Sequence, residues 1–189
     1  IARLLNADAV EHEACDALPV LGTTTTVVGN GNVAMDIIRL LAATQQQLQD
    51  SDIHTATHQA LTTGLTTINV VGRSPVAAAK FDLVMLREIA DLPGINHTVI
   101  GFDPAQAASD DPRQALVAEL AQRDTDPQAW LRINWYFQHA PAQVLTNHGS
   151  VAALEVSSGS THTLIESSSI ITAIGFCAAD GEQLVDIND

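Results

Sequence analysis

The 189-residue sequence has little basic charge, few aromatic residues and almost no cysteine. Lys80 is the only lysine among eight basic residues, against 22 acidic ones, so the formal net charge is −14. Such a surface repels nucleic acid and acidic proteins, and it also keeps a protein in solution. The charge therefore argues against nucleic acid as a partner, and we interpret it mainly as a source of solubility.

Long apolar runs and paired cysteines are also missing. No run approaches the roughly 18 apolar residues that cross a bilayer, and residues 1–6 lack the architecture of a signal peptide. Cys15 and Cys177 lie far apart and form no Cys-x-x-Cys motif, so neither a redox dithiol nor a zinc site is indicated. We expect a cytoplasmic protein, and the first residue, Ile1, suggests a piece of a longer chain.

A glycine-rich turn is the most informative feature that is present. An apolar strand over residues 23–28 leads into Gly29-Asn30-Gly31-Asn32-Val33-Ala34, and a helix is expected over residues 32–43. This is the dinucleotide fingerprint G-x-G-x-x-A: the first glycine permits a tight turn, the second lets the backbone approach a pyrophosphate, and the alanine allows close helix packing. The free N–H groups of the helix would face the phosphates. The alternative is a turn of this kind without a ligand.

A second phosphate contact is predicted at the end of the next parallel strand. Residues 67–71 read as a buried strand that ends in Gly72-Arg73-Ser74, where this fold faces the adenosine ribose. NAD sites usually place a carboxylate there, whereas an arginine makes charge-assisted hydrogen bonds to a phosphate. The residue type therefore favours NADP over NAD. The alternative is a surface arginine at a strand end.

The remaining pattern predicts an α/β domain with an antiparallel appendage. We expect helices over about 52–61, capped by Ser51 or Asp52, over 82–91 and over 114–122. Strands are expected over 97–102, 132–137, 142–145, 151–156, 162–165 and 169–174. The strands from residue 132 to 165 are interpreted as one meander, packed by Trp130, Trp135 and Phe137.

No metal site and no catalytic residue is assigned. His54 and His58 are four residues apart on an expected helix, but no H-E-x-x-H motif accompanies them, and a solvated helix face is the preferred interpretation. Asp103, Asp110 and Asp111 are expected to be solvated loop charges rather than an acid–base pair.

Over roughly residues 18–177 the chain resembles the NADP-binding domain of the adrenodoxin-reductase-like ferredoxin–NADP reductases. The order and spacing of six segments agree with that family: residues 28–36, 50–53, 71–73, 86–94, 141–145 and 174–176. The resemblance implies a Rossmann-like three-layer NAD(P)-binding domain, with a parallel sheet and an antiparallel β-meander.

The resemblance also assigns roles to single residues. It implies that the cofactor-binding residues are Gly29, Asn30, Gly31, Asn32 and Val33 at the pyrophosphate, and Arg73 with Ser74 at the 2′-phosphate. The family usually has a second arginine at position 74 and an acidic residue at position 85, which is methionine here. Loss of one arginine predicts weaker NADP binding and a narrower preference over NAD, without supplying the carboxylate that NAD would need.

The family transfers hydride from NADPH to FAD and then single electrons to a ferredoxin. The resemblance implies that residues 1–20 approach from a flavin domain, that residues 21–177 form the NADP-binding domain and that residues 178–189 return toward the flavin domain. FAD would be held by the full-length protein, so this fragment alone is expected to bind nucleotide but to pass no electrons. The alternatives are a glutamate-synthase small-subunit-like enzyme and a non-catalytic nucleotide-binding module.

Overall fold

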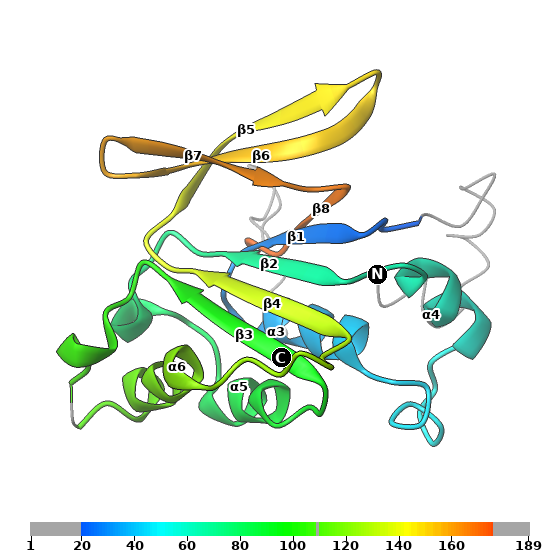
Figure 1. Ribbon diagram of the computed structural model, residues 1–189, viewed down its shortest axis with the longest axis horizontal. Helices are drawn as coiled ribbons and strands as arrows, with labels where there is room; N and C mark the ends of the chain where they lie inside the picture. The colour runs from blue at the N-terminus through cyan, green and yellow to red at the C-terminus, as the bar shows by residue number, and fades with distance from the viewer. Residues whose placement is uncertain (1–19, 109, 176–189) are drawn as a thin grey trace, which may run out of the picture.

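The computed structural model describes residues 20–108 and 110–175, which form three layers (Figure 1). A parallel sheet lies in the middle, helices cover one of its faces, and a small antiparallel sheet lies over the other (Figure 1). This arrangement confirms the predicted fold class. Among the helices of these residues, none has the length and hydropathy that a bilayer crossing requires.

The parallel sheet has five strands in the order β3-β4-β2-β1-β8. Their bounds are Thr24–Val28 for β1, Thr67–Val71 for β2, Ile95–Ile100 for β3, Leu131–Tyr136 for β4 and Ser169–Thr172 for β8. The central strands β1 and β2 consist mainly of β-branched residues and are buried on both faces, as is usual in parallel sheets. Because all five strands are parallel, their carboxyl ends lie at one edge of the sheet, and the turns after them meet there.

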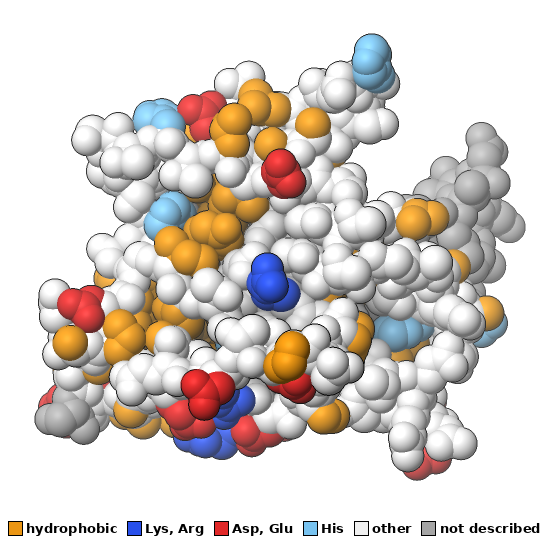
Figure 2. All heavy atoms as spheres, in the orientation of Figure 1, with side chains coloured by type: hydrophobic (Ala, Val, Ile, Leu, Met, Phe, Trp, Pro, Cys, Tyr) orange, Lys and Arg blue, Asp and Glu red, His pale blue; other side chains and the backbone are white. Residues whose placement is uncertain are grey.

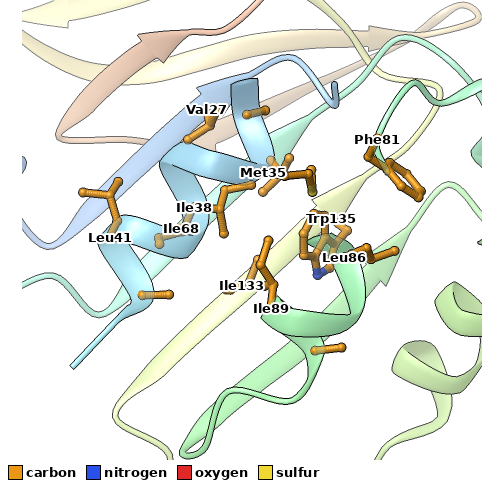
Figure 3. Packing of buried hydrophobic residues seen from close by; sticks show 14 of the residues in the cluster. Val27, Met35, Ile38, Leu41, Ile68, Phe81, Leu86, Ile89, Ile133 and Trp135 are labelled. Atoms are coloured by element: carbon orange, nitrogen blue, oxygen red, sulfur yellow. The ribbon is translucent and has the colours of Figure 1, made fainter. Parts of the chain in front are cut away.

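Three helices cover one face of this sheet: α3 (Asn32–Ala42), α5 (Leu83–Ala90) and α6 (Pro112–Gln122). Figure 3 shows Met35 and Ile38 of α3 pointing toward Ile68 and Ile133 of the sheet, with Trp135 beside α5. The fourth helix, α4 (Thr55–Thr62), precedes β2, and short 3₁₀ turns η1 (Val76–Ala78) and η2 (Pro104–Gln106) follow β2 and β3. Together these elements bury the main hydrophobic core.

The antiparallel sheet consists of β5 (Ala140–Asn147), β6 (Ser150–Ser158) and β7 (Thr161–Glu166). β5 and β6 are joined at His148 and Gly149, whose φ angles of 49° and 81° suit a two-residue hairpin turn. Leu154 and Val156 pack on Val28 of the parallel sheet in a second core. In Figure 2, hydrophobic side chains are visible between the small sheet at the top and the parallel sheet below it. The small sheet therefore covers the carboxyl ends of the central strands.

One strand was assigned to the wrong sheet. Residues 131–136 form β4, which lies between β2 and β3 in the parallel sheet, and only β5, β6 and β7 form the meander. Trp135 and Phe137 consequently pack in the main core on the helix side, and Trp130 contacts Gly94 before β3. The alternation of buried and exposed residues predicts a strand but does not identify its neighbours, which is why this assignment failed.

The start of α4 also differs from the prediction. The helix begins at Thr55, and its N-cap is His54, whose Nδ1 accepts a hydrogen bond from the Thr57 N–H at 3.3 Å. Ser51 is already engaged, because its hydroxyl donates to the Leu48 carbonyl at 2.7 Å. The preceding turn therefore uses the predicted cap residue, and the helix starts later.

Candidate functional site

Gly29 closes the turn after β1, and its backbone requires glycine. Its φ angle is +127°, and a Cβ built there would lie 2.3 Å from the Ala173 carbonyl oxygen. The Gly29 N–H donates to the Val71 carbonyl at 2.8 Å, and the Ala173 N–H donates to Val28 at 2.7 Å. The turn is thus held between β2 and the segment after β8, so Gly29 is required by the fold itself.

Gly31 stands in a different environment. A Cβ built on Gly31 would meet none of the described residues within 4 Å, so the space beside it is open in this part of the structure. Gly31 is the N-cap of α3, no side chain caps the helix, and its first turn carries no acidic residue. The first N–H groups and the positive end of the helix dipole therefore face this space, which is the arrangement that binds anions. Ala34 is fully buried, as the fingerprint requires for close packing of α3.

Asn30 carries a buried donor without a partner. Its Nδ2 is shielded from solvent and has no hydrogen-bond partner in the described parts of the chain. The side chain lies against Gly72, where an added Cβ would come within 2.2 Å of Nδ2. Buried polar groups are nearly always paired, so an orphaned amide of this kind indicates a missing acceptor. A phosphate or ribose oxygen would supply that acceptor.

Asn32 ties the turn to α5. Its Oδ1 accepts a hydrogen bond from the Asp82 N–H at 2.7 Å, and the Asp82 carboxylate in turn caps α5 by accepting from the Val84 N–H at 2.7 Å. Val33, the next residue of α3, is 52% exposed. Asn32 and Val33 therefore remain accessible from solvent at the open end of α3.

Arg73 and Ser74 follow the end of β2. Arg73 is exposed, and within residues 20–108 and 110–175 no hydrogen bond or ion pair engages its guanidinium. In contrast, Arg39 contacts Asp36 at 3.0 Å and Glu88 at 2.9 Å on the helix side. Ser74 is partly buried, and its carbonyl accepts from the Gln138 N–H at 3.2 Å. Arg73 thus has the freedom to meet an anionic ligand.

The predicted residues come together at the carboxyl edge of β1 and β2. The Gly29 N–H and Val71 carbonyl join the two strand ends, and the Asn30 side chain lies over Gly72, next to Arg73. In Figure 1 this edge is found where β1 and β2 lead toward the loops and the start of α3. A ligand bound here would meet backbone N–H donors at one end and a cation at the other.

The sequence interpretation missed the loop after β4. The Gly72 N–H donates to the Tyr136 carbonyl at 2.8 Å, and the His139 N–H donates to the Gly72 carbonyl at 3.0 Å. The His139 ring is buried, and it packs edge-on against Tyr136 with 5.5 Å between ring centroids. Burial raises the pKa of the Tyr136 phenol above its ordinary value, so the phenol stays neutral. Assignment of β4 to the parallel sheet would have placed this loop beside Arg73.

The other candidate residues have structural roles. The solvated helix face predicted for His54 and His58 is wrong for His58, which is buried and has its Nε2 2.8 Å from the Leu40 carbonyl near the end of α3. His54 caps α4, and the structure groups no three metal-ligating side chains within its described residues. Asp103 caps η2 and Asp111 caps α6, where the Gln114 side chain lowers the pKa of the Asp111 carboxyl. Cys15 and Cys177 lie outside the described residues.

Comparison with known proteins identifies relatives of one kind, although no protein-family model matches the chain. Cindoxin reductase of Citrobacter braakii is 36% identical over 165 residues, which are 84% of this chain and 35% of that protein. NADPH-ferredoxin reductase FprA of Mycobacterium tuberculosis is 36% identical over 86 residues, covering 45% and 18%. Mitochondrial NADPH:adrenodoxin oxidoreductase of Bos taurus is 30% identical over 142 residues, covering 65% and 28%. These relatives confirm the resemblance drawn from the sequence.

Comparison of the fold with solved structures agrees with these relatives. The structure of Mycobacterium tuberculosis FprA in complex with NADPH matches with a TM-score of 0.70 at 22% identity, over 84% of this chain and 40% of that one. At this identity the match establishes the fold alone. The chain spans about a third or less of the length of the curated relatives named above, so their complete activities involve regions that it does not match.

Proposed function

We propose, from the premise that this chain is a homologue of the adrenodoxin-reductase-like ferredoxin–NADP reductases, that it contains the NADP(H)-binding domain of such a flavoenzyme. The domain would comprise residues 21–177, with residues 1–20 and 178–189 leading to and from a flavin domain of the same chain. A ferredoxin would be the electron acceptor, and the cysteine usage of the sequence favours a cytoplasmic location.

The open N-terminus of α3 is the observation that carries this proposal. The space beside Gly31 is open, because a Cβ built there would meet none of the described residues within 4 Å, and the N-cap residue offers no side chain to the first N–H groups of the helix. Asn30, the residue before Gly31, has a buried Nδ2 without a hydrogen-bond partner among the described residues. These residues fit a dinucleotide, whose pyrophosphate would accept hydrogen bonds from the backbone of Gly31, Asn32 and Val33.

Arg73 supports NADP as the nucleotide. Its guanidinium lies at the end of β2, where the ribose 2′ position of a dinucleotide is expected, and two phosphate oxygens match its paired donors. Asp82 is the next acidic residue after Arg73 in the sequence, and its side chain already caps α5, so it is not free to hold a 2′-hydroxyl. Ser74 would contribute at most a hydroxyl. A modest preference for NADP over NAD follows.

The chain contributes binding and orientation to the proposed reaction. Bound NADPH supplies a hydride, which FAD of the full-length protein would accept before passing single electrons onward. The turn from Gly29 to Val33 would fix the pyrophosphate, and Arg73 would fix the adenosine end. We assign no proton or hydride transfer to any described side chain, and we propose that the fragment alone binds nucleotide without transferring electrons.

Calorimetric titration of 2′,5′-ADP and 5′-AMP tests this function directly, because the two ligands differ only in the 2′-phosphate. We expect 2′,5′-ADP to bind more tightly by about 1.5–3 kcal/mol, or roughly 10- to 150-fold. Arg73→Ala should remove most of that difference. Arg132→Ala is the matched control, since Arg132 is exposed at the opposite end of β4, in register with Thr67. Equal affinity of the wild-type chain for the two ligands would contradict the NADP assignment.

A further inference from the structure

Asn30 and Gly31 form the only Asn-Gly pair in the sequence. In such a pair the backbone nitrogen of the glycine attacks the side-chain amide of the asparagine more readily than in other pairs, because glycine has no Cβ to obstruct the approach. The product is a five-membered succinimide, which water opens to aspartate or isoaspartate. Since Gly31 is the N-cap of α3, a covalent change here would alter the proposed phosphate site.

The attacking nitrogen is not engaged elsewhere. The Gly31 N–H donates no hydrogen bond to the residues that the structure describes, and a Cβ built on Gly31 would meet none of them within 4 Å. Attack requires the nitrogen to lose its proton, and the positive end of the α3 dipole stabilises negative charge at this position. The backbone around Gly31 therefore has both the room and the electrostatic field that the reaction needs.

The amide that would leave is not held in place either. Asn30 Nδ2 is buried, has no hydrogen-bond partner among the described residues and lies against Gly72. Asn32, the second asparagine of the motif, differs in both respects. Its Oδ1 accepts a hydrogen bond from the Asp82 N–H at 2.7 Å, and it is followed by the β-branched Val33. Of the two asparagines, Asn30 is thus the one open to reaction.

We propose that Asn30 is a site of spontaneous deamidation and that a bound nucleotide suppresses the reaction. The Gly31 nitrogen, after losing its proton to hydroxide, forms a bond to Asn30 Cγ, and the Cγ–Nδ2 bond breaks with release of ammonia. Water then opens the ring at either carbonyl and leaves one carboxylate, so the overall change is a hydrolysis without oxidation or reduction. The modification depends on the turn alone, whereas its suppression rests on the proposed function.

Nucleotide binding and deamidation compete for the same atoms. A pyrophosphate that accepts a hydrogen bond from the Gly31 N–H would keep the proton on the attacking nitrogen. Conversely, a carboxylate at position 30 would place negative charge beside the phosphates, and isoaspartate would add a carbon atom to the backbone of the turn. The chain without nucleotide would therefore lose its binding site with time, and the loaded chain would keep it.

Peptide mapping by mass spectrometry follows this conversion in the folded 189-residue chain at mildly alkaline pH. Asn30 should convert faster than Asn147, an exposed asparagine that is followed by His148. NADP at about ten times its Kd should slow the conversion of Asn30 by about tenfold, because only the free chain reacts, and should leave Asn147 unaffected. Gly31→Ala should slow the conversion without NADP, since its Cβ obstructs ring closure while its φ of −98° suits alanine.

Two substitutions at position 30 measure the consequence for binding. Asn30→Asp reproduces the charge of the product, and Asn30→Ala removes the same amide without adding charge. Calorimetric titration should give an NADP affinity at least about tenfold lower for the aspartate variant than for the alanine variant. Equal affinities of the two variants would overturn the proposed effect on binding.

The remaining outcomes separate this inference from the proposed function. Conversion of Asn30 no faster than that of Asn147 in the free chain would overturn the modification site. Binding of NADP that leaves the rate at Asn30 unchanged would overturn the suppression and leave the proposed function intact. Absence of NADP binding to the freshly prepared chain would overturn the proposed function, while the comparison of Asn30 with Asn147 would still decide the modification site.

Discussion

The two halves of the sheet's carboxyl edge are built from opposite chemistry. Over β1 and β2 the available groups are donors: the first N–H groups of α3 and the guanidinium of Arg73, with the buried, unpaired Nδ2 of Asn30 between the two strand ends. Over β3 and β4 the groups include acceptors: the Asp103 carboxylate and Oε1 of Gln138. A ligand that spans both halves would meet hydrogen-bond donors at one end and acceptors at the other. The edge therefore has donors over one pair of strands and acceptors over the other.

The largest effect on the donor half is expected from a side chain that fills the open space beside Gly31. Gly31→Val should abolish detectable NADP binding, because the side chain enters the space that the pyrophosphate would occupy, while no described residue lies within 4 Å of its Cβ to oppose it. Calorimetric titration and a thermal unfolding curve check this together. Unchanged affinity in a folded Gly31→Val protein would remove the phosphate site.

Gly29→Ala is the matched control for that variant. Its Cβ would meet the Ala173 carbonyl, and its φ of +127° disfavours any side chain, so this change should lower the free energy of unfolding. The two glycines of one motif should thus differ, Gly31 affecting mainly binding and Gly29 mainly stability. Equal loss of stability in both variants would contradict this distinction.

Lowering the pH should reduce the stability of the fold through His97, which lies on β3 in the β3–β4 half of the sheet. Trp135 donates its Nε1–H to His97 Nδ1 at 3.2 Å, and Nε2 of His97 is buried without a partner in the described structure. Burial, together with the Arg123 charge, lowers the pKa of His97 from 6.5 to about 4. The unfolded chain therefore binds this proton more readily than the folded chain between these pH values. Stability should fall by about 3 kcal/mol as the pH drops from 6.5 to 4.

Urea unfolding at several pH values measures this effect. His97→Gln keeps an acceptor for Trp135 without an ionisable ring, so its loss of stability over the same pH range should be smaller by about 3 kcal/mol. His162→Gln is the control, since His162 is exposed on β7 beside Glu155. Identical pH dependence of His97→Gln and the wild type would show that His97 is not the responsible group.

The smallest expected effect concerns the affinity of the donor half for a 2′-phosphate. Ser74→Arg should strengthen binding of 2′,5′-ADP relative to 5′-AMP by a further three- to tenfold, about 1 kcal/mol, because a second guanidinium would share the phosphate. The increase should diminish as salt is raised, since the loop is open to solvent. Titrations of both ligands at low and high ionic strength provide the measurement. A variant with no added preference would place the 2′-phosphate away from residue 74.

The same comparison explains what the sequence could predict. Gly29, Gly31 and Arg73 lie in short local patterns, so the strand–turn–helix and the end of β2 were predicted with nearly correct bounds. Their proposed contacts with nucleotide stay predictions. The β3–β4 half depends on β4 pairing with β2 across more than sixty residues, and no local pattern records that pairing. Gln138 reaches Ser74 only through this strand order, which is why its position was missed.

Strand β8 pairs with β1, and the bond between the Thr25 and Ser169 hydroxyls joins residues 144 positions apart. During synthesis on the ribosome, β1 emerges long before the strand that completes its second edge. The threonine- and valine-rich strand is therefore left with an open edge until residue 172 has been made, and open apolar edges favour aggregation. A nascent chain of this protein has a long interval in which a chaperone that shields extended segments would improve its yield.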